Sequence, residues 1–578
     1  MFRKTLLLIV MFVSVTAMAR DREYLWHKKS MPYTQEHQIA AMTDELRQKG
    51  FDPKKNRIAY IEWFDAPNAA NRTDVCMVLV SGGSYESCCD VGLIKQWSET
   101  FTNMGIQCVN LVYRTPRPVG MDIYQTAWAD GQRAIRMIRQ QAAKRGFNPE
   151  KIGVISMSAG SHLALLLATS SQTAAYDAVD HLDTIPCHIN WAIVNAPAYG
   201  TTDAEKGTPS TRQGYGPDVR LSSVFKFDQR TCPMSLHHGG MDIYSPYTST
   251  LVYRQLRRMR IPADLHLYPN KGHGAYGLER GIEFMRQMGF LGQLGKEEHI
   301  LHRFSSDEHR AQHSQYNIWP EGKTPDFQEN QNVPYIEWHM PKELKTKAIQ
   351  IVYAGGAYEY NKPEEHEVAP VRRYLNEKGM AVVTLKYRSP RPAAPLAKHT
   401  TAWQDLQRAI RIVRAEAPSR GLDPNRIGIM GSSAGGHLTL MGTTSSMHRS
   451  YLPIDDIDKI ACNVQWGIVI YPAYVLDDGT NGTNARGGND DDVHFVPDFS
   501  FDIKTSPMIF MHGDSDPYAA MNSVKAWERL QQMGVQCELH SFAKRNHCFP
   551  RNASPQTASY NFFDIIWEYL TKMGFNKD

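Results

Sequence analysis

The segment Ile427–Leu438 (IGIMGSSAGGHL) holds the strongest fold signal in the chain. Its first four residues predict a buried strand, and a helix is expected to begin near Gly436. Between them, Gly431–Gly435 matches the pattern G-x-S-x-G, in which small residues beside Ser433 allow a sharp, strained turn that lifts the serine hydroxyl clear of the backbone. A strand, such a turn and a helix in this order favour an α/β fold.

A second copy of this segment lies 275 residues earlier in the chain. There Ser156–Gly160 (SMSAG) has serine in place of the first glycine, a small residue that should still permit the turn. The sequence YIEW also occurs twice at this offset, at Tyr60–Trp63 and Tyr335–Trp338. Further repeated pairs are Tyr113–Pro118 with Tyr387–Pro392, Thr126–Trp128 with Thr401–Trp403, and Trp191 with Trp466.

A repeat this long indicates a duplicated domain rather than a solenoid. At 578 residues the chain exceeds one compact core, whereas two domains of roughly 270 residues suit α/β enzymes. We expect a signal peptide at residues 1–19, domain 1 at 20–292, a polar linker at 293–315 and domain 2 at 316–578. Strands alternating with helices predict, in each domain, a mostly parallel sheet covered by helices on both faces.

Helix signals in domain 1 run from Trp128 to Arg145, and the tryptophan is expected in the core. Asp130 and Arg133 lie near the start of this helix, as Asp405 and Arg408 do in domain 2. Each pair is interpreted as a helix-start charge and a structural ion pair.

The composition is that of an ordinary globular protein, with 42% hydrophobic and 21% charged residues. The formal charge of +4 is spread along the chain and forms no basic block. We therefore expect neither a nucleic acid nor a membrane surface as a partner, and the oligomeric state stays open.

The N-terminus has the features of an export signal. Arg3 and Lys4 precede an apolar run at 6–15, which is too short to span a bilayer, and Ala17–Ala19 (AMA) provides a small-x-small cleavage site. We expect export to a periplasm or to the outside of the cell.

The nine cysteines show no spacing typical of zinc ligands, and their odd number leaves at least one unpaired within a monomer. They are interpreted as structural. The Asp-rich and Gly-rich segment 477–492 fits no complete calcium loop. No metal or organic cofactor is expected.

A serine hydroxyl becomes a useful nucleophile when a histidine takes its proton and a carboxylate orients that histidine. The hydrolase fold places these residues in the order Ser, Asp, His, each after a strand. In domain 2, Asp516 follows the expected strand 506–511, and His547 follows the strand 539–542. Asp514 is the lesser candidate because only Asp516 aligns with Asp242.

Domain 1 offers the same set: Ser158, Asp242 and His273. The separation from Ser to Asp is 84 residues in domain 1 and 83 in domain 2, and the separation from Asp to His is 31 in both. Equal spacing and element order distinguish His273 and His547 from the other histidines. We therefore expect two Ser-His-Asp triads in two α/β-hydrolase domains.

An oxyanion hole needs hydrogen-bond donors fixed where negative charge develops. One donor is expected from the backbone N–H after each nucleophile, and the other from a glycine-containing loop after the first core strand. A plain tight turn is the alternative for that loop. The expected residues are Gly83, Ser84 and Ala159 in domain 1, and Gly356, Ala357 and Ala434 in domain 2.

Tyr85 and Glu86, like Tyr358 and Glu359, directly follow these loops. Because aromatic faces suit pyranose rings, these residues are candidates for substrate binding; core packing is the equal alternative for the tyrosines.

The Gly-Gly-x-Tyr loop, the Tyr-Arg after a strand, the Gln-Arg-Ala-Ile-Arg helix and the Ser-Ala-Gly-Gly-His-Leu turn resemble bacterial acetylxylan-esterase-like α/β hydrolases, which are related to the hormone-sensitive-lipase and feruloyl-esterase groups. The resemblance covers almost the whole mature chain, once per domain. Ser156 and Ser161 stand in domain 1 where domain 2 has Gly431 and Gly436, which makes domain 1 the weaker match.

The resemblance implies a secreted serine carboxylesterase that acts on acylated carbohydrate, such as plant xylan, or on small esters. Two alternatives stay open. One is a serine peptidase of the prolyl-oligopeptidase type, although its usual β-propeller is absent from the sequence. The other is one active esterase domain joined to a degenerate binding domain.

Overall fold

The computed structural model describes residues 22–27, 30–33, 58–67, 71–88, 90–208, 219–292, 314–364, 367–477, 493–552, 559 and 561–577. The expected signal peptide and nearly all of the expected linker lie outside these residues, so both stay predictions. Among the described helices, none combines the length and apolar character needed to cross a bilayer.

The described part of domain 1 has eight strands, most of them fully buried. β1 and β2 pair antiparallel and β2 pairs antiparallel with β4, whereas all other neighbours are parallel. In spatial order the strands are β1 (Arg22–Tyr24), β2 (Tyr60–Phe64), β4 (Gln107–Val112), β3 (Cys76–Val80), β5 (Ile152–Met157), β6 (Trp191–Asn195), β7 (Met234–Gly239) and β8 (Ala263–Tyr268).

Domain 2 repeats this order strand for strand, which confirms the fold class expected from the repeat. Its strands are β9 (Ser314–Asn317), β10 (Tyr335–His339), β12 (Ala381–Lys386), β11 (Ile349–Tyr353), β13 (Ile427–Ser432), β14 (Trp466–Ile470), β17 (Met508–Gly513) and β18 (Cys537–Phe542). A separate two-stranded hairpin joins β15 (Leu476–Asp477) and β16 (His494–Phe495).

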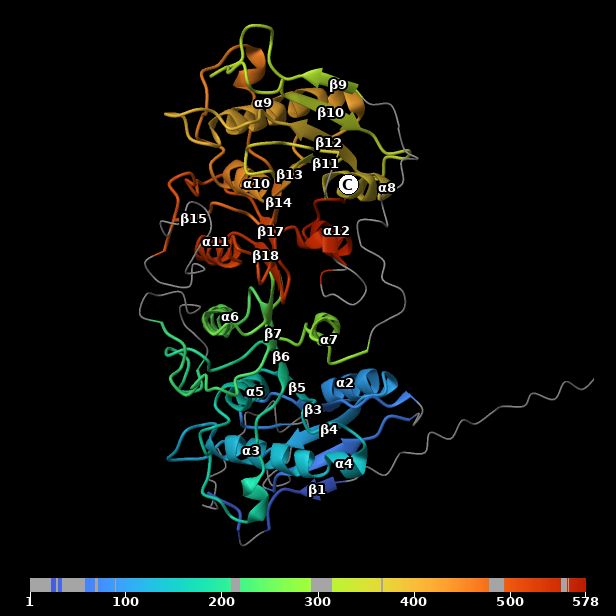
Figure 1. Ribbon diagram of the computed structural model, residues 1–578, viewed down its shortest axis with the longest axis vertical. Coiled ribbons are helices and arrows are strands. Elements are labelled where there is room, and N and C mark those ends of the chain that lie inside the picture. The colour runs from blue at the N-terminus through green and yellow to red at the C-terminus, as the bar shows by residue number, and fades with distance from the viewer. Residues whose placement is uncertain are drawn as a thin grey trace, which may run out of the picture.

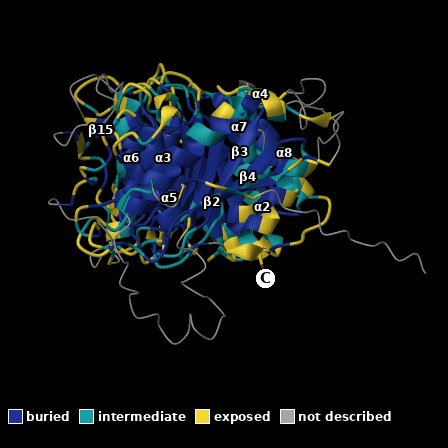
Figure 2. Cartoon of the chain, turned by 90° about the horizontal axis from the view of Figure 1, so that it is seen from below, coloured by how far each residue is buried: buried dark blue, intermediate teal, exposed yellow. Residues whose placement is uncertain are grey.

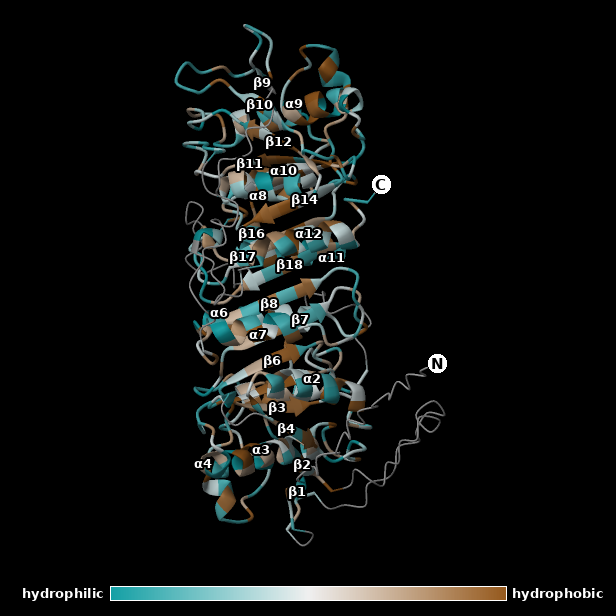
Figure 3. Cartoon of the chain, turned by 90° about the vertical axis from the view of Figure 1, so that its right-hand side faces the viewer, coloured by the Kyte–Doolittle hydropathy of each residue, from teal (hydrophilic) through white to brown (hydrophobic). Residues whose placement is uncertain are grey.

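The two domains share one sheet. β8 and β18 pair antiparallel, which joins the eight sheet strands of each domain in a single sixteen-stranded sheet that leaves out the β15–β16 hairpin. Figure 3 shows the result: the arrows of β3 and β6 point one way along the sheet and that of β14 points the other. Parallel α/β sheets carry their functional loops at the carboxyl ends of their strands. Because β8 and β18 run antiparallel, these strand ends point in opposite directions in the two domains.

Polar side chains hold this seam between β8 and β18 together. His266 stands opposite His540 in the strand pairing, with their Nδ1 atoms 2.8 Å apart, and burial lowers the pKa of both imidazoles. Beside them, the hydroxyl of Tyr253 and the guanidinium of Arg257 donate to Asp514 at 2.9 and 2.5 Å. Asp514, the lesser triad candidate, is thus a contact between the domains.

Helices cover both faces of the sheet (Figures 1 and 2). One face carries α3 (Gln125–Gln140), α5 (Ala159–Thr169), α6 (Tyr247–Arg258), α9 (Thr400–Glu416), α10 (Ala434–Thr444) and α11 (Met521–Gln532), whose buried side chains form one hydrophobic core through both domains. The other face carries α2 (Val91–Asn103) and α7 (Leu278–Gln287) over one core, and α8 (Val368–Glu377) and α12 (Phe562–Lys572) over another.

The expected helix at 128–145 begins earlier and is interrupted. α3 starts at Gln125, and a separate turn, α4 (Ala142–Arg145), follows it. Trp128 is 7% exposed and Trp403 is 5% exposed, so both rings lie in the core as expected. The eight described cysteines are free thiols, seven of them buried.

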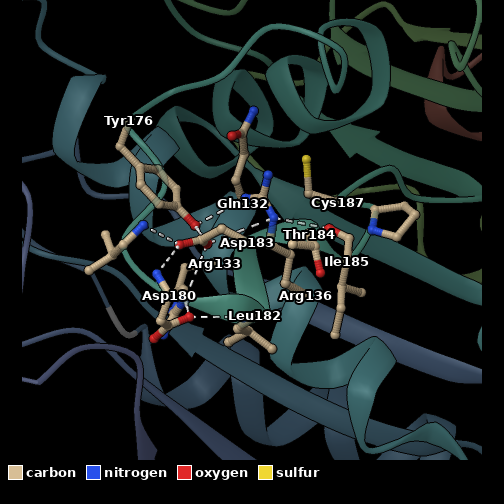
Figure 4. A network of polar contacts seen from close by, with 12 residues as sticks. Gln132, Arg133, Arg136, Tyr176, Asp180, Leu182, Asp183, Thr184, Ile185 and Cys187 are labelled. Carbon is tan, nitrogen blue, oxygen red and sulfur yellow. Dashed lines mark hydrogen bonds and ion pairs between the residues drawn. The ribbon is translucent and has the colours of Figure 1, made fainter.

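The charged residues of α3 bind distant partners rather than each other. Asp130 is bound by Arg114 at 2.8 Å, with both side chains fully buried. Arg133 instead donates to Asp180, just before the short turn η2 (His181–Thr184), and to Asp183 on that turn, as Figure 4 shows. The expected pairing within the helix is therefore wrong, because Asp130 faces the end of a strand.

Domain 2 repeats both contacts. Asp405 accepts hydrogen bonds from Arg388 Nε at 2.9 and 3.0 Å and from Trp319 Nε1 at 2.7 Å. Arg408 binds Asp455 and Asp458 at 2.6 and 3.0 Å. In both domains these pairs tie the long helix to the sheet and to the segment after the next helix.

Replacing Asp405 with alanine should lower the free energy of unfolding of domain 2 by about 3–5 kcal/mol, because the buried guanidinium of Arg388 would lose its counter-charge. Urea unfolding measures the change. Asp456→Ala, which removes an exposed partner of Lys459, is the control and should change stability little. An equally small effect of both variants would contradict a structural role for Asp405.

Candidate active site

Both candidate nucleophiles occupy the turn between a strand and a helix. Ser158 lies between β5 and α5 with φ 58° and ψ −124°, and Ser433 lies between β13 and α10 with φ 56° and ψ −120°. A positive φ is strained for a serine and costs about 1–3 kcal/mol. The turn holds each hydroxyl at the carboxyl end of the sheet, where the strands after it deliver their own loops.

In domain 1 these loops bring Ser158, His273 and Asp242 together. Ser158 Oγ lies 2.7 Å from Nε2 of His273, and Nδ1 of the same ring lies 2.9 Å from both carboxylate oxygens of Asp242. Asp242 follows β7 and its side chain is fully buried, whereas the imidazole after β8 keeps 23% of its surface exposed. The ring can therefore meet a substrate and still be held by the carboxylate.

Domain 2 has the same geometry. Ser433 Oγ lies 2.9 Å from Nε2 of His547, and Nδ1 of His547 lies 2.7 Å from Oδ2 of Asp516. The side chain of Asp516 is fully buried and that of His547 is 21% exposed. The two domains thus arrange six residues in two sets with closely similar contact distances.

A second histidine stands behind each carboxylate. His238 Nε2 lies 3.3 Å from Asp242, and His512 Nε2 lies 3.4 Å from Asp516. Burial alone would raise the pKa of Asp242, but the adjacent imidazoles of His238 and His273 outweigh it and lower the pKa below its ordinary value. The same balance lowers the pKa of Asp516. Both carboxylates are therefore charged at neutral pH.

Sequence reasoning missed His238 and His512. The signal was present, because each precedes its aspartate by four residues, at the end of β7 and of β17.

The expected oxyanion loops lie directly over the nucleophiles. A Cβ added to Gly82 would stand 2.7 Å from Cβ of Ser158, and one added to Gly355 would stand 2.8 Å from Cβ of Ser433. Only glycine permits this approach. The next glycines, Gly83 and Gly356, have φ of 131° and 113° and turn the chain over the serine.

The remaining expected donors follow in sequence. Ser84 and Ala357 continue the loops with φ of 56° and 55°, and Ala159 and Ala434 are the first residues of α5 and α10. These positions place backbone N–H groups from two segments beside each serine. Their role as oxyanion donors stays a prediction.

The departure of domain 1 from the glycine pattern does not open the turn. Ser156 Oγ and Ser161 Oγ lie 3.0 Å apart, and Ser161 Oγ donates to Asn195 O at 2.7 Å. In domain 2, Gly431 instead leaves room for the ring of Tyr353, which a Cβ there would approach to 2.5 Å. Different side chains therefore fill the space beside the turn in the two domains. The φ and ψ angles of Ser158 and Ser433 nevertheless agree within a few degrees.

With this geometry established, known proteins are informative. The family model BD-FAE, which describes feruloyl-esterase-type α/β hydrolases, matches the chain at residues 64–213 and again at 336–465. The chain contains the BD-FAE domain twice. Each match includes the serine turn and the glycine loop but ends before the aspartate and the histidine.

Two curated relatives each match part of the chain. Endo-1,4-beta-xylanase B of Butyrivibrio fibrisolvens is 24% identical over 263 residues, 44% of this chain and 38% of the relative. Acetylxylan esterase of Xylanibacter ruminicola is 23% identical over 222 residues, 36% of this chain and 42% of the relative. The chain thus spans less than half the length of either relative.

Among solved structures, an acetyl ester-xyloside bifunctional hydrolase from Caldicellulosiruptor lactoaceticus is 26% identical. The alignment covers 45% of this chain and 97% of that one, with a TM-score of 0.36.

In both BD-FAE domains the expected sugar-facing tyrosines are buried. Tyr85 is 1% exposed and Tyr358 is 0% exposed. Their hydroxyls lie 2.8 Å from Nδ1 of His162 and 2.9 Å from Nδ1 of His437. In this arrangement neither ring presents a face to a sugar, and the backbone at both tyrosines has a positive φ, of 60° and 63°.

The neighbouring carboxylates stay at the surface of each BD-FAE domain. Glu86 pairs with Arg117 at 2.5 Å and Glu359 with Arg391 at 2.5 Å, with the glutamates 23% and 42% exposed. Substrate binding by either glutamate stays a prediction.

The surroundings of the candidate catalytic imidazole differ between the BD-FAE domains. In domain 1 the ring of Tyr244 lies 5.2 Å from that of His273. In domain 2 two tyrosines, Tyr518 and Tyr471, lie 4.9 and 4.8 Å from the ring of His547. Tyr471 is hydrogen-bonded to the buried Glu367. The two sites therefore offer differently shaped approaches to similar triads.

Proposed function

We propose that this protein is a serine carboxylesterase that removes acyl groups from plant cell-wall polysaccharides such as xylan, with one active site in each BD-FAE domain. The observation that carries the proposal is the contact series Ser–His–Asp, present in both domains at hydrogen-bond distances. The names of the curated relatives, a xylanase and an acetylxylan esterase, support the carbohydrate substrate.

The geometry supports an acyl-enzyme mechanism. Ser158 or Ser433 attacks the ester carbonyl while Nε2 of the adjacent histidine takes the hydroxyl proton. The buried aspartate stabilises the imidazolium, and backbone N–H groups stabilise the oxyanion. The sugar hydroxyl leaves with the proton from the same histidine. Water activated by that histidine then releases the acid and restores the serine.

We further propose that the first nineteen residues export the protein, so that it meets polymeric substrate in a periplasm or outside the cell. The charged residues followed by the apolar run and the AMA site support this proposal. The location of the protein determines which substrate it meets: intact polysaccharide outside the cell, or oligosaccharide released from it in a periplasm.

The proposal is tested by measuring acetate and ferulate release from native xylan and pectin by the mature chain and by Ser158→Ala and Ser433→Ala. We expect acyl release that is reduced in each variant, with a different preference left in each, because the tyrosines around the two histidines differ. Loss of all release in Ser433→Ala alone would leave domain 1 as a binding domain. A chain that releases neither acid but cleaves prolyl peptides would overturn the proposal in favour of a peptidase.

A further inference from the structure

Domain 2 carries a cluster of two histidines and one aspartate beside its candidate active site. His399 is the residue before α9, His437 lies in the first turn of α10, and Asp498 lies just after the β15–β16 hairpin. Nε2 of His437 and Nδ1 of His399 lie 3.1 and 3.2 Å from the same oxygen, Oδ2 of Asp498. One potential ligand atom from each residue lies within 4.8 Å of the others.

These distances suit a shared divalent ion. Nitrogen and oxygen ligands about 2.0–2.1 Å from a tetrahedral zinc ion stand roughly 3.3 Å from one another. The side chain of His437 is 1% exposed, while His399 and Asp498 are 13% and 22% exposed. The cluster is therefore anchored inside the domain and open to solvent on one side, from which an ion and a water ligand can enter.

The contacts around the cluster also suit a metal. A metal-bound histidine usually donates its other ring N–H to a fixed acceptor. Nδ1 of His437 lies 2.9 Å from the hydroxyl of the buried Tyr358, which leaves Nε2 for the cluster. The adjacent Lys398 does not extend into the cluster's place, since its Nζ lies over the ring of Tyr474, 3.8 Å from the centroid.

Domain 1 shows that the fold does not need this cluster. His162 keeps the position of His437, including the contact with a buried tyrosine. The residue before α3, however, is Tyr124. The position of Asp498 is taken by Val224: Ser170 and Ser445 donate to the backbone oxygens of these two residues at 3.1 and 3.3 Å. Two of the three ligand positions thus differ in domain 1.

We propose that His399, His437 and Asp498 bind one divalent transition-metal ion of the zinc class, and that domain 1 has no equivalent site. The ion links the start of α9, the helix that follows Ser433 and the segment after the hairpin. Its chemistry there is structural: it fixes the helix behind the serine and, through Tyr358, the loop over the serine. The proposal does not depend on the proposed esterase function.

The test is titration of the metal-free mature chain with Co²⁺ at neutral pH, followed by visible absorption and equilibrium dialysis. We expect one ion per chain. His399→Tyr and Asp498→Val, which copy the residues of domain 1, should each weaken binding at least about 100-fold, since a lost ligand costs more than a lost outer contact. Because domain 1 already holds Tyr and Val at these positions, both variants should fold.

His162→Gln is the matched control for His437→Gln. The first changes only domain 1 and should leave the stoichiometry and affinity for Co²⁺ unchanged, whereas the second should abolish binding. Thermal unfolding of each metal-free variant shows that it is folded before titration. No Co²⁺ binding by the unaltered chain, or binding that His399→Tyr and Asp498→Val leave unchanged, would overturn the proposal.

Discussion

The variant carrying both Ser158→Ala and Ser433→Ala should hydrolyse nitrophenyl acetate roughly 10⁴–10⁶-fold more slowly than the unaltered chain. Each substitution removes the hydroxyl oxygen that stands 2.7 or 2.9 Å from Nε2 of the candidate base. Without it no acyl-enzyme forms, and only the polarisation of the ester by the loop remains. Initial rates at saturating ester measure the effect.

The rates of the two single variants show how much each domain contributes to hydrolysis. Each should retain the share of the intact site, because the serines lie in separate domains at opposite edges of the sheet. Ser419→Ala, which removes an exposed hydroxyl that donates to Glu416 O, is the control and should keep the full rate. If the double variant were as fast as the unaltered chain, neither serine would be the nucleophile.

The second large effect is expected from the buried carboxylates. In a chain that already carries Ser158→Ala, Asp516→Asn should lower kcat about 10⁴-fold. Nδ1 of His547 lies 2.7 Å from Oδ2 of Asp516, so the carboxylate holds the ring with its proton on Nδ1. An amide can instead donate to Nδ1, which leaves the proton on Nε2 and removes the base that Ser433 needs.

Asp514→Asn is the matched control for this substitution. Asp514 lies two residues earlier but binds Tyr253 and Arg257 at the seam, so its loss should affect stability and leave kcat nearly unchanged. The reciprocal experiment, Asp242→Asn in a chain with Ser433→Ala, examines domain 1. Equal kcat for Asp516→Asn and Asp514→Asn would refute the assigned role of Asp516.

The fold class and the residues that meet at the two sites can be predicted from the sequence, because each motif that indicates them lies within a short stretch of the chain. A serine turn between a strand and a helix, and an aspartate and a histidine after the next strands, follow from element order. The sequence also repeats them, so each assignment is tested against the other copy. Contacts between distant segments had no such support.

The seam between the domains shows the difference. β8 (ADLHLY) and β18 (CELHSF) are fully buried strands, and each reads like an interior strand of its own sheet. The sequence pattern shows that a strand is buried, but it does not show which neighbouring strand covers it. The partner of Asp130 was missed for a related reason: Arg133, one turn away, is the local candidate, whereas Arg114 is brought near only by the fold.

The tyrosines after the glycine loops were ambiguous in sequence. An aromatic residue beside a nucleophile can line the cleft or support it from below, and the residue type does not decide between the two. In the fold Tyr85 and Tyr358 point toward an interior histidine, which their hydroxyls contact at 2.8 and 2.9 Å.

The seam has a consequence for how the two halves can diverge. A dimer of identical chains meeting across a twofold axis must place the same residues on both sides, and every change appears twice. Here His266 faces His540, but the two flanking pairs differ from each other: Leu265 faces Ser541, whereas Leu267 faces Leu539. Because the two domains belong to one chain, their facing residues need not be identical. One domain can therefore gain metal ligands or different residues around its active site while the other domain stays unchanged.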